Sequence, residues 1–309
     1  MRVLLTGASS FTGFWFASSL RAGGFDVIAP LRRKPASYEG VRGERVQKLA
    51  AVANIVPDCS FGSGRFLDLV ARERFDLLCH HAARVTDYRS MSFDIVGALA
   101  ENTNNVEPIL ERMAASGLKA VVLTGTVFEA NEGAGSWPLR AFSPYGVSKG
   151  LTSDVFRYWC THFGIPFAKF VIPNPFGPFE EPRFCAYLMQ TWRASETAEV
   201  RTPLYLRDNI HVDVLALAYA DYVKRAGQGG HPDKFGPMGY VETQAAFMKR
   251  FAREMRSRLD WECAVRIPKQ TDFSEPIARI NTHPLDTAAL GWSESAAWDA
   301  IAEYYRERL

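Results

Sequence analysis

Two groups of residues in this sequence have the types and the spacing that hydride chemistry needs. A glycine-rich stretch, residues 6–13, follows the short apolar run 2–5, and Tyr145 and Lys149 lie four residues apart much later in the chain. A glycine-rich turn between a buried strand and a helix lets backbone N–H groups and the positive end of the helix dipole approach a pyrophosphate. The first group therefore predicts a dinucleotide site.

The glycine-rich stretch is an incomplete form of the dinucleotide fingerprint. Gly7 and Gly13 bracket the turn, but Ser10 stands where the fingerprint usually has its middle glycine. By itself the stretch fits a plain strand–turn–helix as well as it fits a cofactor site.

Tyr145 and Lys149 fall on one face of the helix predicted over residues 145–163. A phenol titrates near pH 10 in water, and we expect a neighbouring ammonium to lower the pKa of Tyr145 and make it a usable acid or base. Thr124 ends the preceding apolar run, where its hydroxyl could polarise a carbonyl group. A Tyr and a Lys four residues apart often occur by chance. Here they follow a glycine-rich turn and a strand-terminal Thr in the chain, and this order of three features favours a catalytic role over chance.

The elements that must position these residues alternate along the chain. We predict strands at residues 2–5, 26–30, 75–79, 119–123 and 166–172, and helices at 98–116 and 145–163. Nearly continuous apolar strands alternating with helices predict an α/β fold with a doubly wound, Rossmann-like parallel sheet. After Pro178 the prolines multiply, which indicates a smaller C-terminal substrate lobe. We assign residues 1–173, with 207–228 returning, to the dinucleotide-binding domain, and 174–206 and 229–309 to the substrate lobe.

Composition supports a globular enzyme. The chain has 309 residues, 47% hydrophobic and 23% charged, with a formal net charge of +2. This balance predicts neither a nucleic-acid partner nor a polybasic membrane patch. No apolar run approaches the roughly 18 residues needed to span a bilayer, so we expect a cytoplasmic protein. The five cysteines lack Cys-x-x-Cys spacing and the histidines lack ligand spacing, which predicts reduced thiols and no catalytic metal.

In chain order, these stretches resemble the extended short-chain dehydrogenases/reductases, in the branch of nucleotide-sugar epimerases and dehydratases typified by UDP-glucose 4-epimerase. The resemblance covers nearly the whole chain. It rests on seven short stretches, which together and in this order are more specific than any one of them. They are residues 6–13, 81–83, 102, 123–128, 145–149, 173–178 and 207–213.

The resemblance implies roles for individual residues. Thr124, Tyr145 and Lys149 would be catalytic: Tyr145 exchanges the proton, Lys149 lowers its pKa and holds the nicotinamide ribose, and Thr124 orients the sugar oxygen. Further cofactor contacts are implied for Gly7, Ser9, Ser10, Phe11, Thr12, Gly13, Asp58, Cys59, His81, Ala82, Ala83 and Asn102.

Substrate contacts are implied for Thr86, Thr126, Asn174 and Arg207. A guanidinium fork suits a diphosphate, and an amide suits sugar hydroxyls. Without the family, Arg207 is equally explained by an ion pair with Asp208, and Asn174 by a turn before a proline. We expect residues 179–206 to line the substrate pocket.

The cofactor loop departs from the pattern of NAD-specific members. These usually end the second strand with an acid that binds the ribose 2′-hydroxyl, but here Arg32 and Arg33 follow the predicted strand. The cations favour NADP over NAD as the cofactor, and a solvated basic loop is the alternative.

The residues after Thr124 narrow the reaction. Sugar 4,6-dehydratases resembling this family carry Asp-Glu there, whereas this chain has Gly125 and Thr126, which disfavours elimination. Members that epimerise before reducing use a Cys and a His where this chain has Thr126 and Phe179, and neither side chain does acid/base work at neutral pH.

Among the reactions of the family, the remaining one is hydride transfer at one carbinol or keto carbon of a nucleotide-activated sugar. Tyr145 would act as its acid/base. Reduction of a keto-sugar nucleotide is slightly favoured, because the Arg32–Arg33 loop suits NADPH. The alternatives are 4-epimerisation with a recycled NAD, a reaction on a carbonyl compound without a nucleotide, and a non-catalytic dinucleotide sensor.

The predicted helices 98–116 and 145–163 are the ones that relatives pair between two subunits. Val155, Phe156, Trp159 and Phe163 give the second helix more apolar bulk than one sheet face needs. We therefore expect a homodimer, with core packing of the same residues as the alternative.

Overall fold

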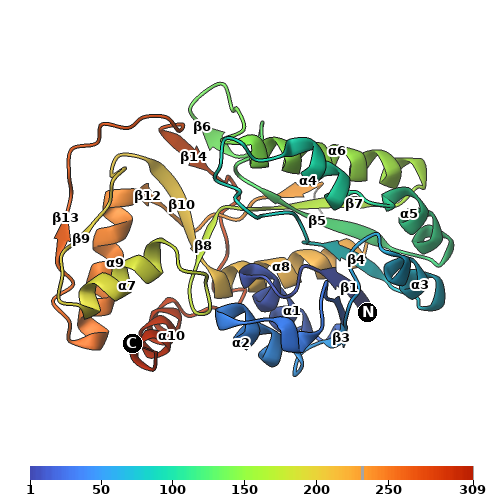
Figure 1. The fold of residues 1–309 in the computed structure, drawn as a ribbon, viewed down its shortest axis with the longest axis horizontal. Coiled ribbons are helices and arrows are strands. Elements are labelled where there is room, and N and C mark those ends of the chain that lie inside the picture. Colours follow the sequence, from blue (N-terminus) through green and yellow to red (C-terminus); the bar gives the residue numbers. More distant parts are fainter. Residues whose placement is uncertain (231–232, 309) are drawn as a thin grey trace.

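A seven-stranded parallel sheet forms the larger of two lobes that lie side by side (Figure 1). The computed structural model describes residues 1–230 and 233–308. The sheet order is β11-β7-β5-β4-β1-β2-β3, so the chain winds outward from β1 in both directions. This confirms the predicted doubly wound α/β fold. The strands are β1 (Arg2–Thr6), β2 (Asp26–Pro30), β3 (Asn54–Val56), β4 (Leu77–His80), β5 (Ala120–Thr126), β7 (Phe167–Ile172) and β11 (Lys234–Phe235).

Helices cover both faces of this sheet, which is why its central strands are apolar throughout: every residue of β5 is buried. One face carries α1 (Phe11–Ala22), α2 (Gly40–Leu49) and α8 (Val212–Gly227), and the short 3₁₀ turn η1 (Pro35–Ser37) precedes α2. The other face carries α3 (Gly64–Arg72), α5 (Val106–Ala115) and α6 (Pro144–His162), with α4 (Ile95–Asn102) packed against α6.

Side-chain caps set where the helices α1 and α6 begin. The Ser10 hydroxyl accepts a hydrogen bond from the Gly13 amide at the start of α1. Ser143 caps α6 in the same way, and Pro144 at its first position has the φ that a helix needs. Tyr145 therefore lies in the first turn of α6 and Lys149 one turn further.

The helix predicted over residues 98–116 is two helices, α4 and α5. Asn105 adopts a left-handed conformation with φ of 53°, which interrupts the helix after Asn102 and lets α5 restart at Val106. The break leaves Asn102 at the end of α4, where its side chain accepts a hydrogen bond from the Arg84 amide.

The second lobe is built on a smaller mixed sheet and its own apolar core. Its strands are β6 (Ala134–Gly135), β8 (Asn174–Phe176), β10 (Leu206–His211), β12 (Tyr240–Thr243) and β14 (Ala278–Ile280), with β9 (Ala198–Glu199) and β13 (Val265–Arg266) forming a separate pair. Helices α7 (Phe184–Arg193), α9 (Gln244–Leu259) and α10 (Glu294–Arg306) enclose the core.

The chain crosses between the lobes at several points. β10 belongs to the smaller sheet, whereas α8, which follows it directly, packs on α1 of the larger lobe. β11, from the segment assigned to the substrate lobe, pairs with β7 at the edge of the larger sheet.

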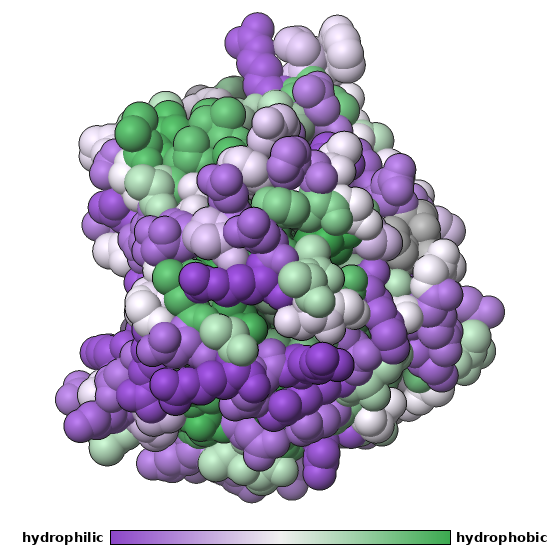
Figure 2. Space-filling view, turned by 90° about the vertical axis from the view of Figure 1, so that its right-hand side faces the viewer, coloured by the Kyte–Doolittle hydropathy of each residue, from purple (hydrophilic) through white to green (hydrophobic). Residues whose placement is uncertain are grey.

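The side of the molecule at the right of Figure 1 is mostly hydrophilic, with apolar patches of which the largest lies at the upper left of Figure 2. The exposed apolar side chains include Val96 on α4 and Val147 and Leu151 on α6. Among the described residues, no helix has the length and hydropathy to span a bilayer.

Candidate active site

A cavity of about 1080 Å³ lies where the carboxyl ends of the parallel strands meet the second lobe. Doubly wound sheets bind their ligands at this place, and the volume exceeds the roughly 300–1,000 Å³ typical of single-ligand pockets. Most predicted site residues line it: Gly7, Ser9, Ser10, Phe11, Thr12, Arg32, Cys59, His81, Ala82, Ala83, Thr86, Asn102, Thr126, Tyr145, Lys149, Asn174 and Arg207. Gly13, Arg33, Asp58 and Thr124 are not among the lining residues.

The glycine-rich turn forms one end of the cavity. Gly7 has a φ of +75°, and a Cβ at this position would lie 2.8 Å from the Ala82 backbone nitrogen, so only glycine fits between the turn and β4. The Ser10 hydroxyl donates to the Gly7 carbonyl over 2.9 Å and accepts from the Gly13 amide over 3.1 Å. Ser10 therefore closes the turn, and the N-terminus of α1 faces a space that suits a pyrophosphate.

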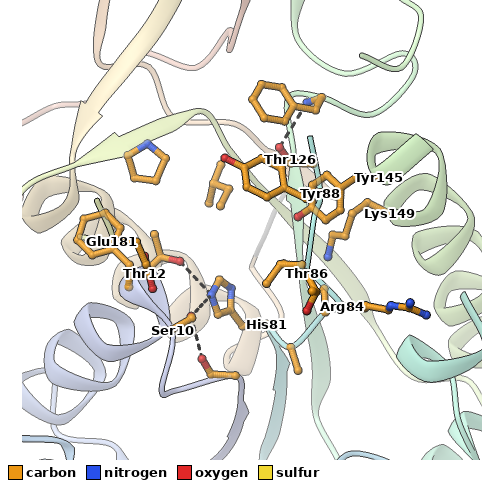
Figure 3. A pocket seen from close by; sticks show the side chains of 18 of the residues that line it. Ser10, Thr12, His81, Arg84, Thr86, Tyr88, Thr126, Tyr145, Lys149 and Glu181 are labelled. Atoms are coloured by element: carbon orange, nitrogen blue, oxygen red, sulfur yellow. Dashed lines mark hydrogen bonds between the residues drawn. The ribbon is translucent and has the colours of Figure 1, made fainter. Parts of the chain in front are cut away.

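His81 joins this turn to β4. Its Nε2 lies 2.9 Å from the Thr12 hydroxyl and 3.1 Å from that of Ser10 (Figure 3). Burial, with a smaller effect of the Lys149 charge, lowers the pKa of His81 to about 3, so the ring is neutral. The adjacent His80 packs against Phe156 on the opposite face of the sheet.

Arginines gather where β2 ends, at the position for the adenosine half of a dinucleotide. Arg32 lines the cavity and pairs with Glu101, and Arg33 stacks over Tyr38 with 4.6 Å between the guanidinium carbon and the ring centroid. Arg42 on α2 also lines the cavity and donates to the Ser9 hydroxyl over 2.8 Å. Sequence reasoning missed Arg42, because it lies in α2 outside any motif.

Asp58 and Cys59 close the turn behind this region. Asp58 has a left-handed backbone with φ of 52°, and the Cys59 amide donates to the Leu31 carbonyl over 2.7 Å. Only Cys59 reaches the cavity. The left-handed turn at Asp58 lets the chain place Cys59 beside the end of β2.

Tyr145 and Lys149 project from α6 on the side of the cavity opposite Ser10, Thr12 and His81 (Figure 3). The Lys149 ammonium donates to the Thr124 carbonyl oxygen over 2.7 Å. Burial lowers the pKa of Lys149 to about 8, against a raising effect of Glu129.

The pKa of Tyr145 is raised from its ordinary value, first by burial and then by the charges of Glu129 and Tyr88, while Arg183 opposes the change. The predicted lowering of this pKa is therefore wrong for the protein alone. Moving a phenolate out of water costs more free energy than its attraction to the Arg183 cation provides.

The two threonines of β5 differ in their surroundings. Thr124 is buried and its hydroxyl faces Tyr219 of α8, so Thr124 meets Lys149 through its carbonyl oxygen and not through its hydroxyl. Thr126 lines the cavity, and its hydroxyl accepts a hydrogen bond from the Phe128 amide over 3.3 Å. Thr124 is therefore not placed to contact a ligand in the cavity, whereas Thr126 is.

Aromatic rings surround the Tyr145 side chain. Tyr88 meets it edge to face with centroids 5.5 Å apart, and Phe93 does so at 5.9 Å. The Arg183 guanidinium lies 5.7 Å from the Tyr88 centroid. Sequence reasoning missed Tyr88, which lies in a connecting segment without a motif, whereas Arg183 belongs to the segment 179–206 that was expected to line the pocket.

The far end of the cavity is polar and lies in the second lobe. The Arg207 guanidinium donates to Glu275 over 2.8 Å and to the Pro276 carbonyl over 2.9 Å. The Asn174 amide donates to the Asp208 carbonyl over 3.2 Å. The Nδ2 of Asn209 is buried without a hydrogen-bond partner among the described residues, although this side chain lines the cavity.

The segment 179–206 contributes Glu180, Glu181, Arg183, Phe184, Cys185, Thr202 and Tyr205 to the lining, in line with the expectation for it. The described residues contain no group of three or more His, Cys, Asp or Glu side chains arranged to hold a metal ion.

Solved structures with the same fold cover almost the whole chain. A UDP-glucose 4-epimerase from Thermotoga maritima, solved with UDP-glucose, is 19% identical with a TM-score of 0.74, over 100% of this chain and 99% of that one. A UDP-glucuronic acid 4-epimerase from Bacillus cereus, solved with UDP-glucuronic acid and NAD, is 16% identical with a TM-score of 0.71, over 100% of both chains.

A dTDP-glucose 4,6-dehydratase from Streptomyces venezuelae, solved with NAD and TYD bound, is 20% identical with a TM-score of 0.70, over 99% of this chain and 97% of that one. At these identities the likeness is one of fold. No curated protein matches the sequence. The family model described as "NAD dependent epimerase/dehydratase family" matches residues 3–235. The chain is therefore a member of the NAD-dependent epimerase/dehydratase family.

Proposed function

We propose that the protein transfers a hydride at a single carbinol or keto carbon of a nucleotide-activated sugar, with Tyr145 as the acid/base and reduction of a keto sugar as the net reaction. The observation that carries the proposal is that Tyr145 and Lys149 line the same cavity as the turn at residues 7–12. The dinucleotide is assigned to the lobe of residues 1–173 with α8, and the sugar nucleotide to the second lobe.

The lining residues fit a dinucleotide from end to end. Gly7, Ser9 and Thr12 would hold the pyrophosphate at the N-terminus of α1, and Arg32 and Arg42 would hold the adenosine half. When bound, the nicotinamide supplies or accepts the hydride. The ammonium of Lys149, fixed by the Thr124 carbonyl, would bind the ribose hydroxyls beside it.

Tyr145 carries the proton. In reduction its hydroxyl donates a proton to the carbonyl oxygen of the sugar as the carbonyl carbon gains the hydride, so the product is a carbinol and Tyr145 is left as a phenolate. The Lys149 ammonium stabilises that phenolate until a proton returns from solvent. Thr126, Arg207 and Asn174 line the cavity. In the proposed reaction Thr126 would hydrogen-bond the reacting oxygen, and Arg207 and Asn174 would hold the diphosphate and a sugar hydroxyl.

Burial raises the pKa of Tyr145, so the side chain is protonated at neutral pH, which is the form that a reduction needs at its start. The second candidate is 4-epimerisation with a retained NAD, which is supported by the fold shared with 4-epimerases. The test supplies UDP-glucose, UDP-glucuronic acid and a dTDP-linked 4-keto sugar with NADPH. Reduction consumes NADPH in step with product, whereas product formed at constant NADPH absorbance would establish epimerisation.

NADP is the proposed cofactor, because Arg32 and Arg42 reach the cavity where β2 ends and the 2′-phosphate of NADP would lie. NAD is the cofactor named for the similar solved structures. A titration of the protein with NADPH and NADH should give the lower Kd for NADPH, and equal or tighter binding of NADH would refute the preference.

A non-catalytic dinucleotide sensor is the competing proposal, and Tyr145→Phe separates the two. We expect this variant to bind NADPH as the parent does and to lose about 10²- to 10⁴-fold in kcat, the usual contribution of a general acid. Unchanged turnover would remove Tyr145 from the mechanism.

Val155, Phe156, Trp159 and Phe163, on which the dimer was expected, pack in or against the core behind the sheet, as the alternative held. A homodimer is proposed instead on the exposed apolar side chains Val96, Val147 and Leu151 of α4 and α6, two helices that pack against each other in the chain. Leu151→Glu should convert a dimer to a monomer in sedimentation analysis. A monomeric parent protein would exclude the dimer.

A further inference from the structure

A row of buried charges lies directly behind the catalytic end of the cavity. The Lys169 ammonium on β7 binds Glu129 over 2.6 Å and Glu132 over 2.7 Å. Glu132 also pairs with Lys234 over 3.0 Å, at the edge of the larger sheet. Lys169, Glu129 and Glu132 are 5%, 1% and 6% exposed, so this row is costly to bury unless each charge is matched.

Glu129 uses both of its carboxylate oxygens within the protein. One accepts from Lys169, and the other accepts from the Thr126 backbone amide over 2.7 Å. Glu129 is not among the residues that line the cavity. It therefore does not touch substrate, but it fixes the end of β5, where Thr126 faces the cavity and the Thr124 carbonyl holds Lys149.

The ion pair also explains Gly125, the residue that replaces the acid of the sugar dehydratases. A Cβ at position 125 would lie 2.5 Å from Cε of Lys169 and 3.0 Å from the Glu129 carboxylate. The Lys169 side chain passes over this point on its way to Glu129, so only glycine leaves room for it. The buried ion pair between Lys169 and Glu129 therefore explains why this chain has glycine where the dehydratases have an acid.

The charge of Glu129 reaches both catalytic side chains. The charged and titratable groups around Lys149 are Glu129, Lys169, His80 and His81, and those around Tyr145 are Glu129, Tyr88 and Arg183. Glu129 is the one member of both sets. Its negative charge favours the ammonium form of Lys149 and the neutral phenol form of Tyr145.

We propose that Glu129, held by Lys169, is a positioning residue that fixes Thr126 and the Lys149-binding carbonyl and provides the negative charge that keeps Lys149 an ammonium in its buried place. The role rests on the proposed function of Tyr145 and Lys149. The charge itself acts whether or not substrate and cofactor are present.

The test follows Lys149 by NMR in protein labelled with ¹³C and ¹⁵N at lysine, without substrate or cofactor, with the signal assigned by its loss in Lys149→Arg. Burial sets the pKa of Lys149 at about 8, within reach of a titration. In Glu129→Gln we expect the midpoint to fall by about one pH unit, because the nearest negative charge is lost. Glu132→Gln is the matched control, since Glu132 binds the same ammonium but not the Thr126 amide, and its midpoint should stay at the parent value.

An unchanged midpoint in Glu129→Gln, or an equal fall in both variants, would overturn the proposal. Should Glu129→Gln not fold, the double variant Glu129→Met with Lys169→Met removes the pair without leaving a buried charge unmatched. In it we expect hydrogen exchange of the Thr126 amide to be at least about tenfold faster than in Glu132→Gln. Equal exchange in the two would refute the positioning role. Because neither readout involves turnover, failure here is distinct from failure of the proposed reaction.

Discussion

The surroundings of Tyr145, and not only its residue type, set its protonation state, because burial raises the pKa of the phenol above its ordinary value. Tyr88 and Phe93 pack edge to face on its ring, which leaves the half-buried Tyr145 side chain at the wall of the cavity. In the proposed reaction a phenolate at this place needs a cation, and Lys149 lies one helical turn away. Under that proposal the lysine stabilises the phenolate that reduction leaves on Tyr145.

Thr124 and Thr126 allow a prediction at this scale, because only Thr126 presents its hydroxyl to the cavity. Thr126→Val should lower kcat/KM by about ten- to a hundredfold, through the loss of one hydrogen bond to the reacting oxygen. Thr124→Val should change kcat/KM by less than about threefold, because the carbonyl that binds Lys149 is kept. Steady-state kinetics of the two variants decide the matter, and a greater loss in Thr124→Val would restore Thr124 as the catalytic hydroxyl.

At the scale of elements, the end of β2 and the helix α2 together build the proposed cofactor preference. Arg32 comes from the strand end, and Arg42 comes from the helix and is tied to Ser9 of the glycine-rich turn. Tyr38 lies between Arg33 and Arg42, with 4.6 Å and 5.3 Å from its ring centroid to their guanidinium carbons. The stacked side chains orient the guanidinium of α2 before a ligand arrives, which reduces the entropy lost on binding.

Arg42→Ala should therefore weaken NADPH binding selectively. We expect the Kd for NADPH to rise by about tenfold or more, as one charge-assisted contact to phosphate is lost, while the Kd for NADH changes by less than about twofold. Arg21→Ala, at an exposed position in the last turn of α1, is the matched control and should leave both constants unchanged. Equal weakening of NADPH and NADH would place Arg42 at the pyrophosphate or in the fold instead.

At the scale of the whole molecule, the cavity exists because the lobes are tied together around it. Arg45 of α2, fully buried, donates to the Phe179 carbonyl over 2.7 Å and to Glu181 over 2.5 Å. Arg279 of β14 donates to the carbonyls of Val127 and Glu129 just after β5. These guanidinium ties link the segments that carry the cofactor turn, the catalytic strand end and the substrate lobe.

Glu180, beside the cavity, makes the stability of this arrangement depend on pH. Burial raises its pKa from 4.5 to about 8, so the folded chain holds a proton there that the unfolded chain releases at lower pH. The folded state binds more protons between these values, and the free energy of unfolding therefore falls as pH rises from about 4.5 to 8.

Glu180→Gln should remove this dependence, since the amide keeps an oxygen for the Ala186 amide and cannot ionise. We expect the variant to match the parent at pH 5 and to be more stable at pH 8 by about 3 kcal/mol, as measured by denaturant unfolding. Glu196→Gln, at an exposed position, should match the parent at both pH values. A Glu180→Gln variant no more stable than the parent at pH 8 would show that Glu180 is ionised in the folded protein.

The sequence by itself determined the five inner strands of the larger sheet, the helix α6 and most of the residues around the cavity. Strand 26–30 agrees residue for residue with β2, and β1, β4, β5 and β7 lie within a few residues of their predicted ranges. These features are local: apolar runs that must be buried on both faces become parallel strands, and cap residues such as Ser10 and Ser143 set helix starts. Ordered motifs then place the glycine-rich turn and the Tyr145 helix at one sheet edge.

Only the tertiary structure decided which side chains face the cavity and which charges surround them. The break at Asn105, the inward position of Arg42 and Tyr88, and the turning of the Thr124 hydroxyl toward α8 depend on packing between segments far apart in sequence. The direction of the change in the pKa of Tyr145 depends on burial, and the Lys169–Glu129 pair spans 40 residues. Desolvation and long-range pairing are properties of the assembled molecule, so no local pattern carries them.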